Sequence, residues 1–302
     1  MFKGIIPPLV IFFDQNGEID YSLNKKHIDQ LIDSGIDGVL LLGSSSEFSS
    51  LKLSEKKEYL KCIVPHINGR VPILVGVGNT VLKESIELAQ YAESIGVQGV
   101  MVVNPYYWKL SNDQMVEYFS EIANAVSIST YLYNIPQLTG QEIPIEVISA
   151  LVEKHPNICG IKETVADFGR IRKVLTEIKG KHPHFEVFTA FDEHLVAGYL
   201  IGAAGSINGT ANFLPEVTVK LLKALESKDF DQIQKYNYQI SSLMQVYEIN
   251  NSFFSTFKEG AYYRWFNDLQ TGVRKPFSYY DKDTRQKVGE LIDSIIDKGV
   301  LH

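Results

Sequence analysis

The sequence predicts a (β/α)8 TIM barrel with a C-terminal α-helical extension. Eight short apolar runs, rich in β-branched residues, alternate with stretches whose apolar residues recur at helical spacing. The runs are apolar throughout, which is typical of parallel strands buried on both faces. Strict alternation of strands and helices predicts a parallel sheet, and eight such units favour a closed barrel. A doubly wound open sheet is the alternative, but no G-x-G-x-x-G motif follows the first run.

The expected elements follow the chain in order. The strands are expected at residues 4–13, 38–42, 71–77, 99–103, 128–133, 157–163, 185–190 and 205–208. Helices are expected at residues 21–34, 83–94, 112–125, 145–154, 168–178 and 194–201. Ser54 is expected to cap one further helix, although Lys57 leaves its capping box incomplete.

The pattern changes after residue 212. Helical stretches at residues 215–226, 230–247, 255–266 and 281–298 follow one another without strands between them. We therefore expect residues 1–212 to form the barrel that carries the active site. Residues 213–302 are expected to form a helical extension packed on that barrel.

Composition excludes several classes of protein. The 302 residues are 45% hydrophobic and 22% charged, an ordinary balance for a globular chain, and the net charge of -7 argues against binding nucleic acid or anionic membranes. Cys62 and Cys159 lie far apart, which argues against a disulfide framework. No signal peptide and no apolar run of about 18 residues is found, so we expect a cytoplasmic protein without a membrane span. No H-E-x-x-H motif supports metal-dependent chemistry.

Lys162 is the strongest candidate for catalysis. It follows the apolar run that begins at Ile158, so it is expected at the C-terminal end of a buried strand. Burial disfavours a charged ammonium, and a neutral amine is a nucleophile that can condense with a carbonyl substrate to form a Schiff base. The alternative is that Lys162 extends to the surface or pairs with Glu163.

Hydroxyl groups dominate the other predicted strand ends, where barrel enzymes place their sites. A serine-rich turn offers hydroxyls and backbone N–H groups to a carboxylate, and tyrosines can relay protons. A solvated turn is the alternative for the serines, and interface packing is the alternative for the tyrosines. Besides Lys162 and Glu163, the strand ends carry Ser44, Ser45, Ser46, Glu47, Tyr106, Tyr107, Tyr133, Asn134, Phe191, Asp192 and Asn208.

Three motifs resemble those of a known family. Residues 43–47 read G-S-S-S-E, residues 133–140 read Y-N-I-P-Q-L-T-G, and residues 160–163 read G-I-K-E. In this order and spacing they are similar to motifs of the pyruvate-dependent class I aldolases and lyases. That family includes dihydrodipicolinate synthase, N-acetylneuraminate lyase and 2-keto-3-deoxygluconate aldolase. The resemblance extends over nearly the whole chain.

The resemblance implies roles for matching residues. Lys162 would be the Schiff-base nucleophile for pyruvate, and Tyr133 the phenol that shuttles protons. Ser44 and Ser45 would hold the pyruvate carboxylate, with Ser44 also in the proton relay. Tyr107 would be a catalytic residue, the relay tyrosine that one subunit lends to its neighbour, which implies an oligomer, commonly a homotetramer built as a dimer of dimers. The substrates would be a keto acid and an aldehyde, with no metal or organic cofactor. The residues expected to contact substrate are Ser44, Ser45, Ser46, Leu138, Asp192 and Ile207.

Two positions depart from the family pattern. Ser46 stands where the family usually has glycine, so the turn could differ in shape if that residue had a positive φ. Leu138 stands where the synthases have an arginine that binds a second carboxylate, and leucine cannot form that ion pair. We therefore expect an aldolase for a 2-keto-3-deoxy sugar acid such as 2-keto-3-deoxygluconate. N-acetylneuraminate lyase, dihydrodipicolinate synthase and a non-catalytic keto-acid-binding protein are the alternatives.

Overall fold

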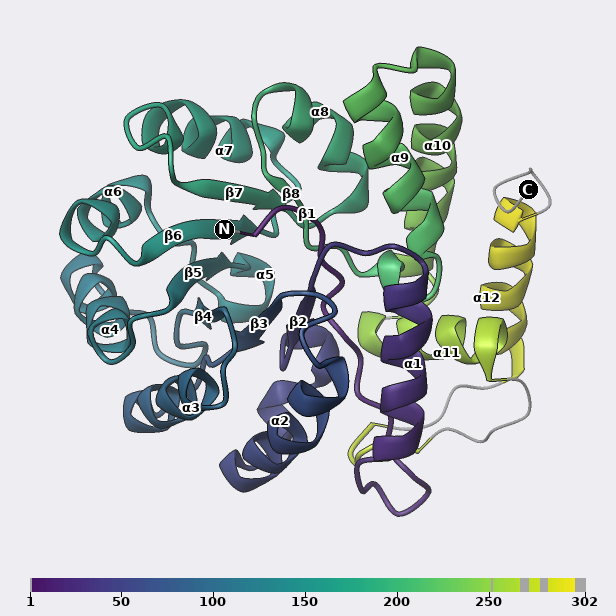
Figure 1. Ribbon diagram of the computed structural model, residues 1–302, viewed down its shortest axis with the longest axis horizontal. Coiled ribbons are helices and arrows are strands. Elements are labelled where there is room, and N and C mark those ends of the chain that lie inside the picture. Colours follow the sequence, from purple (N-terminus) through teal and green to yellow (C-terminus); the bar gives the residue numbers. More distant parts are fainter. Residues whose placement is uncertain (1, 251, 267–271, 278–281, 297–302) are drawn as a thin grey trace.

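The (β/α)8 barrel expected from the sequence is confirmed. The computed structural model describes residues 2–250, 252–266, 272–277 and 282–296. Its eight strands are parallel and pair in the order β1-β8-β7-β6-β5-β4-β3-β2, with helices around the outside (Figure 1). Hydrogen bonds beyond β1 close the ring, because Leu9 N–H donates to the Leu40 carbonyl at 2.9 Å and Leu40 N–H donates to that of Pro7 at 3.0 Å.

Six of the eight strands are shorter than the apolar runs predicted, whereas β4 has the predicted bounds and β5 has the predicted length shifted by one residue. The difference is greatest for the first strand, which was expected to reach residue 13 and ends at Ile5. Pro7 and Pro8 lack the N–H groups that a regular ladder needs, so only isolated pairing continues beyond them. The strands are β1 (Gly4–Ile5), β2 (Val39–Leu41), β3 (Ile73–Gly76), β4 (Gly99–Val103), β5 (Ser129–Asn134), β6 (Ile158–Glu163), β7 (Glu186–Thr189) and β8 (Gly205–Ser206).

The helices follow the predicted pattern with local corrections. Ser54 is not the cap of α2, because that helix begins at Leu53 and the Glu55 carboxylate accepts the Lys52 N–H at 2.8 Å. The ring helices are α1 (Tyr21–Asp33), α2 (Leu53–Ile67), α3 (Leu82–Ser94), α4 (Asn112–Asn124), α6 (Ile145–Lys154), α7 (Phe168–Lys173) and α8 (Leu195–Leu200). A short helix that was not predicted, α5 (Pro136–Thr139), follows β5.

Four helices follow the last strand. They are α9 (Pro215–Ser227), α10 (Phe230–Leu243), α11 (Phe253–Trp265) and α12 (Lys282–Ile295). Helix α9 contacts β1 and α8 as a ring helix would, and α10 packs on α9 (Figure 1). Helix α11 contacts the turn that follows β2. The predicted helix at residues 281–298 is described from 282 to 296, and the division of the chain after residue 212 stays a prediction.

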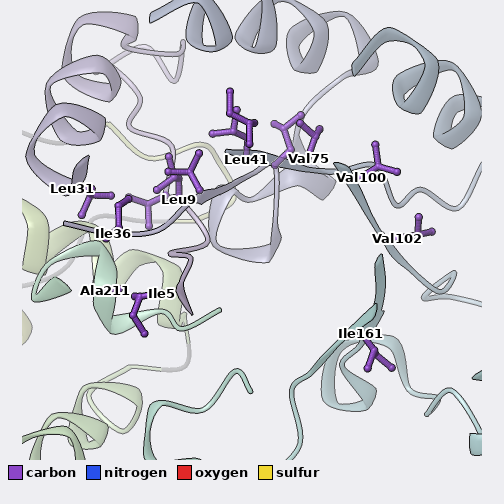
Figure 2. Packing of buried hydrophobic residues seen from close by; sticks show 14 of the residues in the cluster. Ile5, Leu9, Leu31, Ile36, Leu41, Val75, Val100, Val102, Ile161 and Ala211 are labelled. Carbon is purple, nitrogen blue, oxygen red and sulfur yellow. The ribbon is translucent and has the colours of Figure 1, made fainter. Parts of the chain in front are cut away.

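Two apolar layers hold the barrel together. Inside the ring, Ile6, Leu40, Leu74, Met101 and Phe188 form a cluster with other buried residues. Their strand neighbours point outward to the helices, as Leu41, Val75, Val100, Val102 and Ile161 do in Figure 2. Alternate residues of each strand therefore pack in different layers, one inside the barrel and one between the strands and the helices.

His27 of α1 joins the first and last parts of the barrel. Its Nε2–H donates to the Asn212 carbonyl at 2.7 Å. The Asn212 side chain accepts the Val10 N–H at 3.0 Å and donates to the Pro8 carbonyl at 2.9 Å. Burial disfavours the charged imidazolium and lowers the pKa of His27 to about 4.

We expect this histidine to make the barrel sensitive to acid. Because the folded-state pKa lies below the unfolded value, the unfolded chain binds more protons as the pH falls through the interval between them. Stability is therefore complete above about pH 6.5 and is lost towards pH 4, with about 2 kcal/mol gone at pH 5. His27→Gln keeps an N–H donor but does not titrate. Free energies of unfolding in urea at pH 7 and pH 5 should differ by less in this variant than in the wild type, and an equal difference would contradict the assignment.

Candidate active site

The pairing of β5 with β6 places the two main candidates side by side. In the parallel register, Tyr133 is opposite Lys162 and Asn134 is opposite Glu163. Side chains alternate across a strand, so Tyr133 and Lys162 share the inner face while Asn134 and Glu163 share the outer face. The Lys162 Nζ lies 4.3 Å from the centre of the Tyr133 ring.

Glu163 has its own partners outside the barrel. The Asn134 amide donates to one of its oxygens at 2.6 Å, and Arg170 donates to the other at 3.1 and 3.2 Å. Burial raises the pKa of Glu163, while Arg170 and Asn134 oppose that rise. The structure therefore does not pair Lys162 with Glu163. Lys162 as a whole is 4% exposed, and it lines a cavity of about 250 Å³ at the C-terminal ends of the strands.

The serine turn after β2 contributes two of its three hydroxyl residues to this cavity. The Ser44 and Tyr133 hydroxyl oxygens are 3.3 Å apart, within hydrogen-bonding distance, and Ser45 also lines the cavity. Ser46 does not, because it is buried and donates its hydroxyl to the Leu9 carbonyl at 2.5 Å. The turn is a 3-10 helix whose positive φ of 54° falls on Glu47, so serine at position 46 needs no left-handed backbone.

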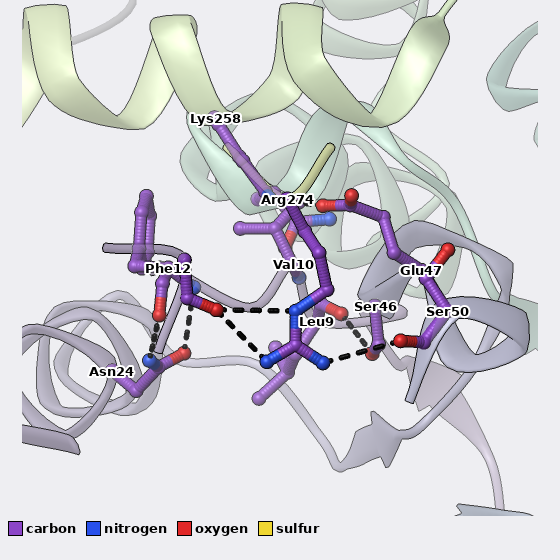
Figure 3. Close-up of polar contacts among 11 residues, drawn as sticks. Leu9, Val10, Phe12, Asn24, Ser46, Glu47, Ser50, Lys258 and Arg274 are labelled. Carbon is purple, nitrogen blue, oxygen red and sulfur yellow. Dashed lines mark hydrogen bonds and ion pairs between the residues drawn. The ribbon is translucent and has the colours of Figure 1, made fainter. Parts of the chain in front are cut away.

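Glu47 ties this turn to the C-terminal helices. Its carboxylate forms an ion pair with the Lys258 ammonium of α11, and both residues are less than 5% exposed (Figure 3). The Lys258 Nζ also lies 4.6 Å from the centre of the Phe13 ring. Burial lowers the pKa of Lys258, and the Glu47 charge opposes that change. The ion pair and the Ser46 hydrogen bond together fix the turn that presents Ser44.

Asp192 is close to the cavity but does not line it. This fully buried carboxylate accepts hydrogen bonds from Asn208 at 2.5 Å, from Tyr247 at 3.2 Å and from Thr210. Burial raises the pKa of Asp192, and these three donors oppose the rise. Tyr247 lines the cavity, so the structure places a tyrosine between Asp192 and any substrate. Burial, followed by the nearby Asp192 charge, raises the pKa of Tyr247 well above its usual range.

The remaining predicted residues divide into two groups. Leu138 and Ile207 line the cavity, as their predicted substrate contacts require. Tyr107 does not, because its side chain is 79% exposed and rests edge-on against Trp108, with ring centres 5.1 Å apart. In the single chain, Tyr107 thus lies outside the cavity that contains Lys162.

Several lining residues were missed by the sequence reasoning. Thr164 has a buried hydroxyl without a hydrogen-bond partner and lies two residues after Lys162. Strand alternation could have found it, since residues two apart share a face. Tyr247, Phe253 and Phe257 come from the helical extension, whose packing over the barrel mouth left no signal in the sequence. The other lining residues that were not predicted are Pro8, Ile135, Gln137, Ala190 and Gly209.

Neither a metal cluster nor a membrane span is found in the part of the chain that the structure describes. Within those residues, no three or more His, Cys, Asp or Glu side chains are grouped so that they could hold a metal ion. No described helix is both long and apolar enough to cross a membrane. The nucleophile available at the site is the Lys162 amine.

A buried lysine beside a tyrosine and a hydroxyl-bearing turn, at the C-terminal mouth of a (β/α)8 barrel, is an arrangement that can form a Schiff base with a carbonyl compound. The chain belongs to the dihydrodipicolinate synthetase family, whose model matches residues 1–295.

Two curated relatives from Escherichia coli K12 carry aldolase names. "Putative 2-dehydro-3-deoxy-D-gluconate aldolase YagE" is 36% identical over 98% of this chain and 97% of its own length. "Probable 2-dehydro-3-deoxy-D-pentonate aldolase YjhH" is 35% identical over 85% of each chain. The crystal structure of YagE in complex with pyruvate superposes with a TM-score of 0.94 over 98% of this chain and 99% of that one, at 35% identity. The crystal structure of dihydrodipicolinate synthase from Aquifex aeolicus superposes with a TM-score of 0.89 over 97% of this chain and 98% of that one, at 26% identity.

We expect the effects of Glu47 and Lys258 on the free energy of unfolding to depend on each other, because the two residues form a buried ion pair. Lys258→Met leaves a buried carboxylate without a counter-charge, which should lower the free energy of unfolding by about 3–5 kcal/mol. Adding Glu47→Gln removes that charge and should recover much of the loss, as urea unfolding of the single and double variants would measure.

The exposed pair Lys57–Glu87 serves as the control, since its glutamate side chain is 56% exposed. Lys57→Met should cost no more than about 1 kcal/mol. Additive losses at Glu47 and Lys258 would show that the two charges do not depend on each other.

Proposed function

We propose that the protein is a pyruvate-dependent class I aldolase that reversibly cleaves a 2-keto-3-deoxy sugar acid, such as 2-keto-3-deoxygluconate, to pyruvate and an aldehyde. Family membership and the aldolase names of the two relatives make the chain a carbon–carbon lyase. The observation that carries the proposed mechanism is the contact of Lys162 with Tyr133, whose hydroxyl is bonded to Ser44. These three groups are a nucleophile, a proton carrier and a relay.

In the proposed reaction, the Lys162 amine attacks the keto carbon of pyruvate and water leaves as the imine forms. The Tyr133 phenol moves protons to and from the departing oxygen, and Ser44 connects that phenol with the substrate. Ser44 and Ser45 hold the pyruvate carboxylate. In synthesis, the protonated pyruvate imine loses a methyl proton to give the enamine that adds to an aldehyde. In cleavage, the imine forms on the keto carbon of the sugar acid and accepts the electrons of the broken C–C bond as the aldehyde leaves; the resulting enamine is then protonated and hydrolysed to pyruvate.

Three alternatives share the fold. N-acetylneuraminate lyase would use the same chemistry on a longer substrate. Dihydrodipicolinate synthase is disfavoured because Leu138 lines the cavity where a charged second substrate would need a cation. A non-catalytic keto-acid-binding protein would retain the pocket without turnover, and Lys162 with Tyr133 would then serve no purpose in binding alone.

We also propose that the chain assembles as a homotetramer, a dimer of dimers, in the cytoplasm. The exposed Tyr107 and Trp108 rings offer an apolar contact through which one subunit could lend Tyr107 to its neighbour. Sedimentation velocity of the purified protein would test the assembly, and a monomer would reject this part of the proposal.

Borohydride should trap pyruvate covalently on Lys162. The intact mass should increase by one reduced pyruvate, and peptide mapping should place it at this residue, because the neutral amine forms the imine that borohydride reduces. An unchanged mass would reject the Schiff-base class.

Two variants separate binding from proton transfer. Lys162→Ala should give no adduct and no turnover. Tyr133→Phe keeps the ring beside Lys162 but lacks the hydroxyl, so turnover should fall by about two to four decades if the phenol carries a general acid–base step.

The substrate is tested by pyruvate release, coupled to lactate dehydrogenase, from 2-keto-3-deoxygluconate, N-acetylneuraminate and 4-hydroxy-2-oxoglutarate. We expect release from the first, because the cavity has hydroxyl groups for a polyol, and no basic side chain besides Lys162 is found among its described lining residues to pair with another carboxylate. Release from another compound alone would change the substrate while keeping the mechanism. If none releases pyruvate but the adduct forms, the aldehyde partner is a different one.

A further inference from the structure

A second cavity adjoins the one that contains Lys162. This outer chamber has a volume of about 330 Å³. Ser44, Ile135, Leu138 and Phe253 line both cavities, so the two cavities share a wall. The catalytic cavity of about 250 Å³ is smaller than the range of about 300–1,000 Å³ that is usual for ligand pockets, and the outer chamber lies within that range.

The outer chamber is lined by the hydroxyl groups of Ser44, Ser49, Ser50 and Ser252 and by five aromatic rings. The rings come from four segments: Phe48 after β2, Tyr106 after β4, Phe253 and Phe254 at the start of α11, and Phe277. The Phe48 and Tyr106 rings meet edge to face with centres 6.1 Å apart, and the Phe254 and Phe277 rings do so at 5.0 Å. Such edge-to-face clusters readily accept a further ring.

The described residues that line the chamber offer no free charge to a ligand. Glu47 is the one acidic or basic side chain among its described lining residues, and its carboxylate is paired with Lys258. The Thr139 hydroxyl is also occupied, because it donates to the Ile135 and Gln141 carbonyls at 3.1 and 2.8 Å. Leu138, at the shared wall, adds a further apolar surface. A charged acceptor would lose its hydration here without gaining a partner.

We propose that the outer chamber binds the ring of an uncharged aromatic aldehyde, so that the enzyme also adds pyruvate to this class of acceptor. The inference rests on the Schiff-base chemistry proposed above. The methyl carbon of the Lys162-bound enamine attacks the aldehyde carbon, one C–C bond forms, and the aldehyde oxygen takes up a proton to become a hydroxyl. Water then hydrolyses the imine, which frees the Lys162 amine and releases a 4-aryl-4-hydroxy-2-oxo acid. No oxidant or reductant is needed.

Benzaldehyde and 4-carboxybenzaldehyde form a matched pair of acceptors that differ in one charge. With pyruvate present, product formation followed by chromatography and mass spectrometry should give kcat/KM for benzaldehyde at least about tenfold above that for 4-carboxybenzaldehyde, since the carboxylate finds no counter-charge. D-glyceraldehyde is the small, hydroxylated reference acceptor. Equal rates for the two aromatic aldehydes, or no product from either, would overturn the proposal.

Variants of the chamber should change acceptor use while borohydride still traps pyruvate. Phe254→Ala and Phe277→Ala should each lower kcat/KM for benzaldehyde about tenfold, with less effect on D-glyceraldehyde. Phe230→Ala, a ring that is 79% exposed on α10, is the control and should change neither. If Phe254→Ala and Phe277→Ala leave benzaldehyde addition unchanged, the rings do not bind the acceptor.

Leu138→Arg provides a second test if the Phe254 and Phe277 variants fold poorly. The Leu138 side chain is 51% exposed, so replacing it should not disturb folding. The added cation should reverse the preference in favour of 4-carboxybenzaldehyde. A wild-type enzyme that adds no benzaldehyde, combined with a Tyr107→Ala variant that does, would mean that a second copy's Tyr107 fills the chamber, and the proposal would fail. Loss of pyruvate trapping in the wild type would instead reject the proposed function itself.

Discussion

The parallel register of β5 and β6 is the constraint on which the site depends. It places Tyr133 beside Lys162 inside the barrel and Asn134 beside Glu163 outside it. A slip of one residue would exchange the two faces and bring a carboxylate into the cavity. Arg170 and Asn134 oppose such a slip, because they supply the charge and the hydrogen bonds that a buried Glu163 requires. Keeping this acid outside prevents an ion pair that would hold the amine in its charged, unreactive form.

The alternation of side chains along parallel strands explains how much of the site could be predicted from the sequence. Lys162 and Tyr133 each stand one residue before the end of adjacent parallel strands, so strand alternation alone brings them together. Asp192 also follows a strand, but it begins a 3-10 turn, and its carboxylate faces Asn208, Thr210 and Tyr247 instead of the cavity. Position in the chain indicates closeness to the barrel mouth, whereas side-chain direction depends on local turns and on partners far away.

Contacts between distant segments account for what could not be predicted. The Glu47–Lys258 pair joins residues 211 positions apart, and no sequence pattern around either residue indicates that the other is its partner. The first strand shows the local counterpart: an apolar run to residue 13 predicted a long strand, yet Pro7 and Pro8 lack ladder donors, and the ring closes through Leu40 and the side chain of Asn212. Hydrophobic pattern thus predicts the number and order of strands better than their lengths.

Helix α11 links the extension to both specificity and chemistry. Phe253 and Phe257, four residues apart on one face, line the catalytic cavity, while Lys258 turns toward Glu47 and the serine turn. Because Lys258 pairs with Glu47 within the protein, Lys162 is the one Lys, Arg, Asp or Glu side chain without an ion-pair partner among the described residues that line the two cavities. In the proposed reaction, the hydroxyl turn and Lys162 receive the keto acid, and the acceptor meets no further unpaired acidic or basic side chain among these residues. The helix that lines the proposed acceptor site, α11, thus also holds the serine turn in place through Lys258.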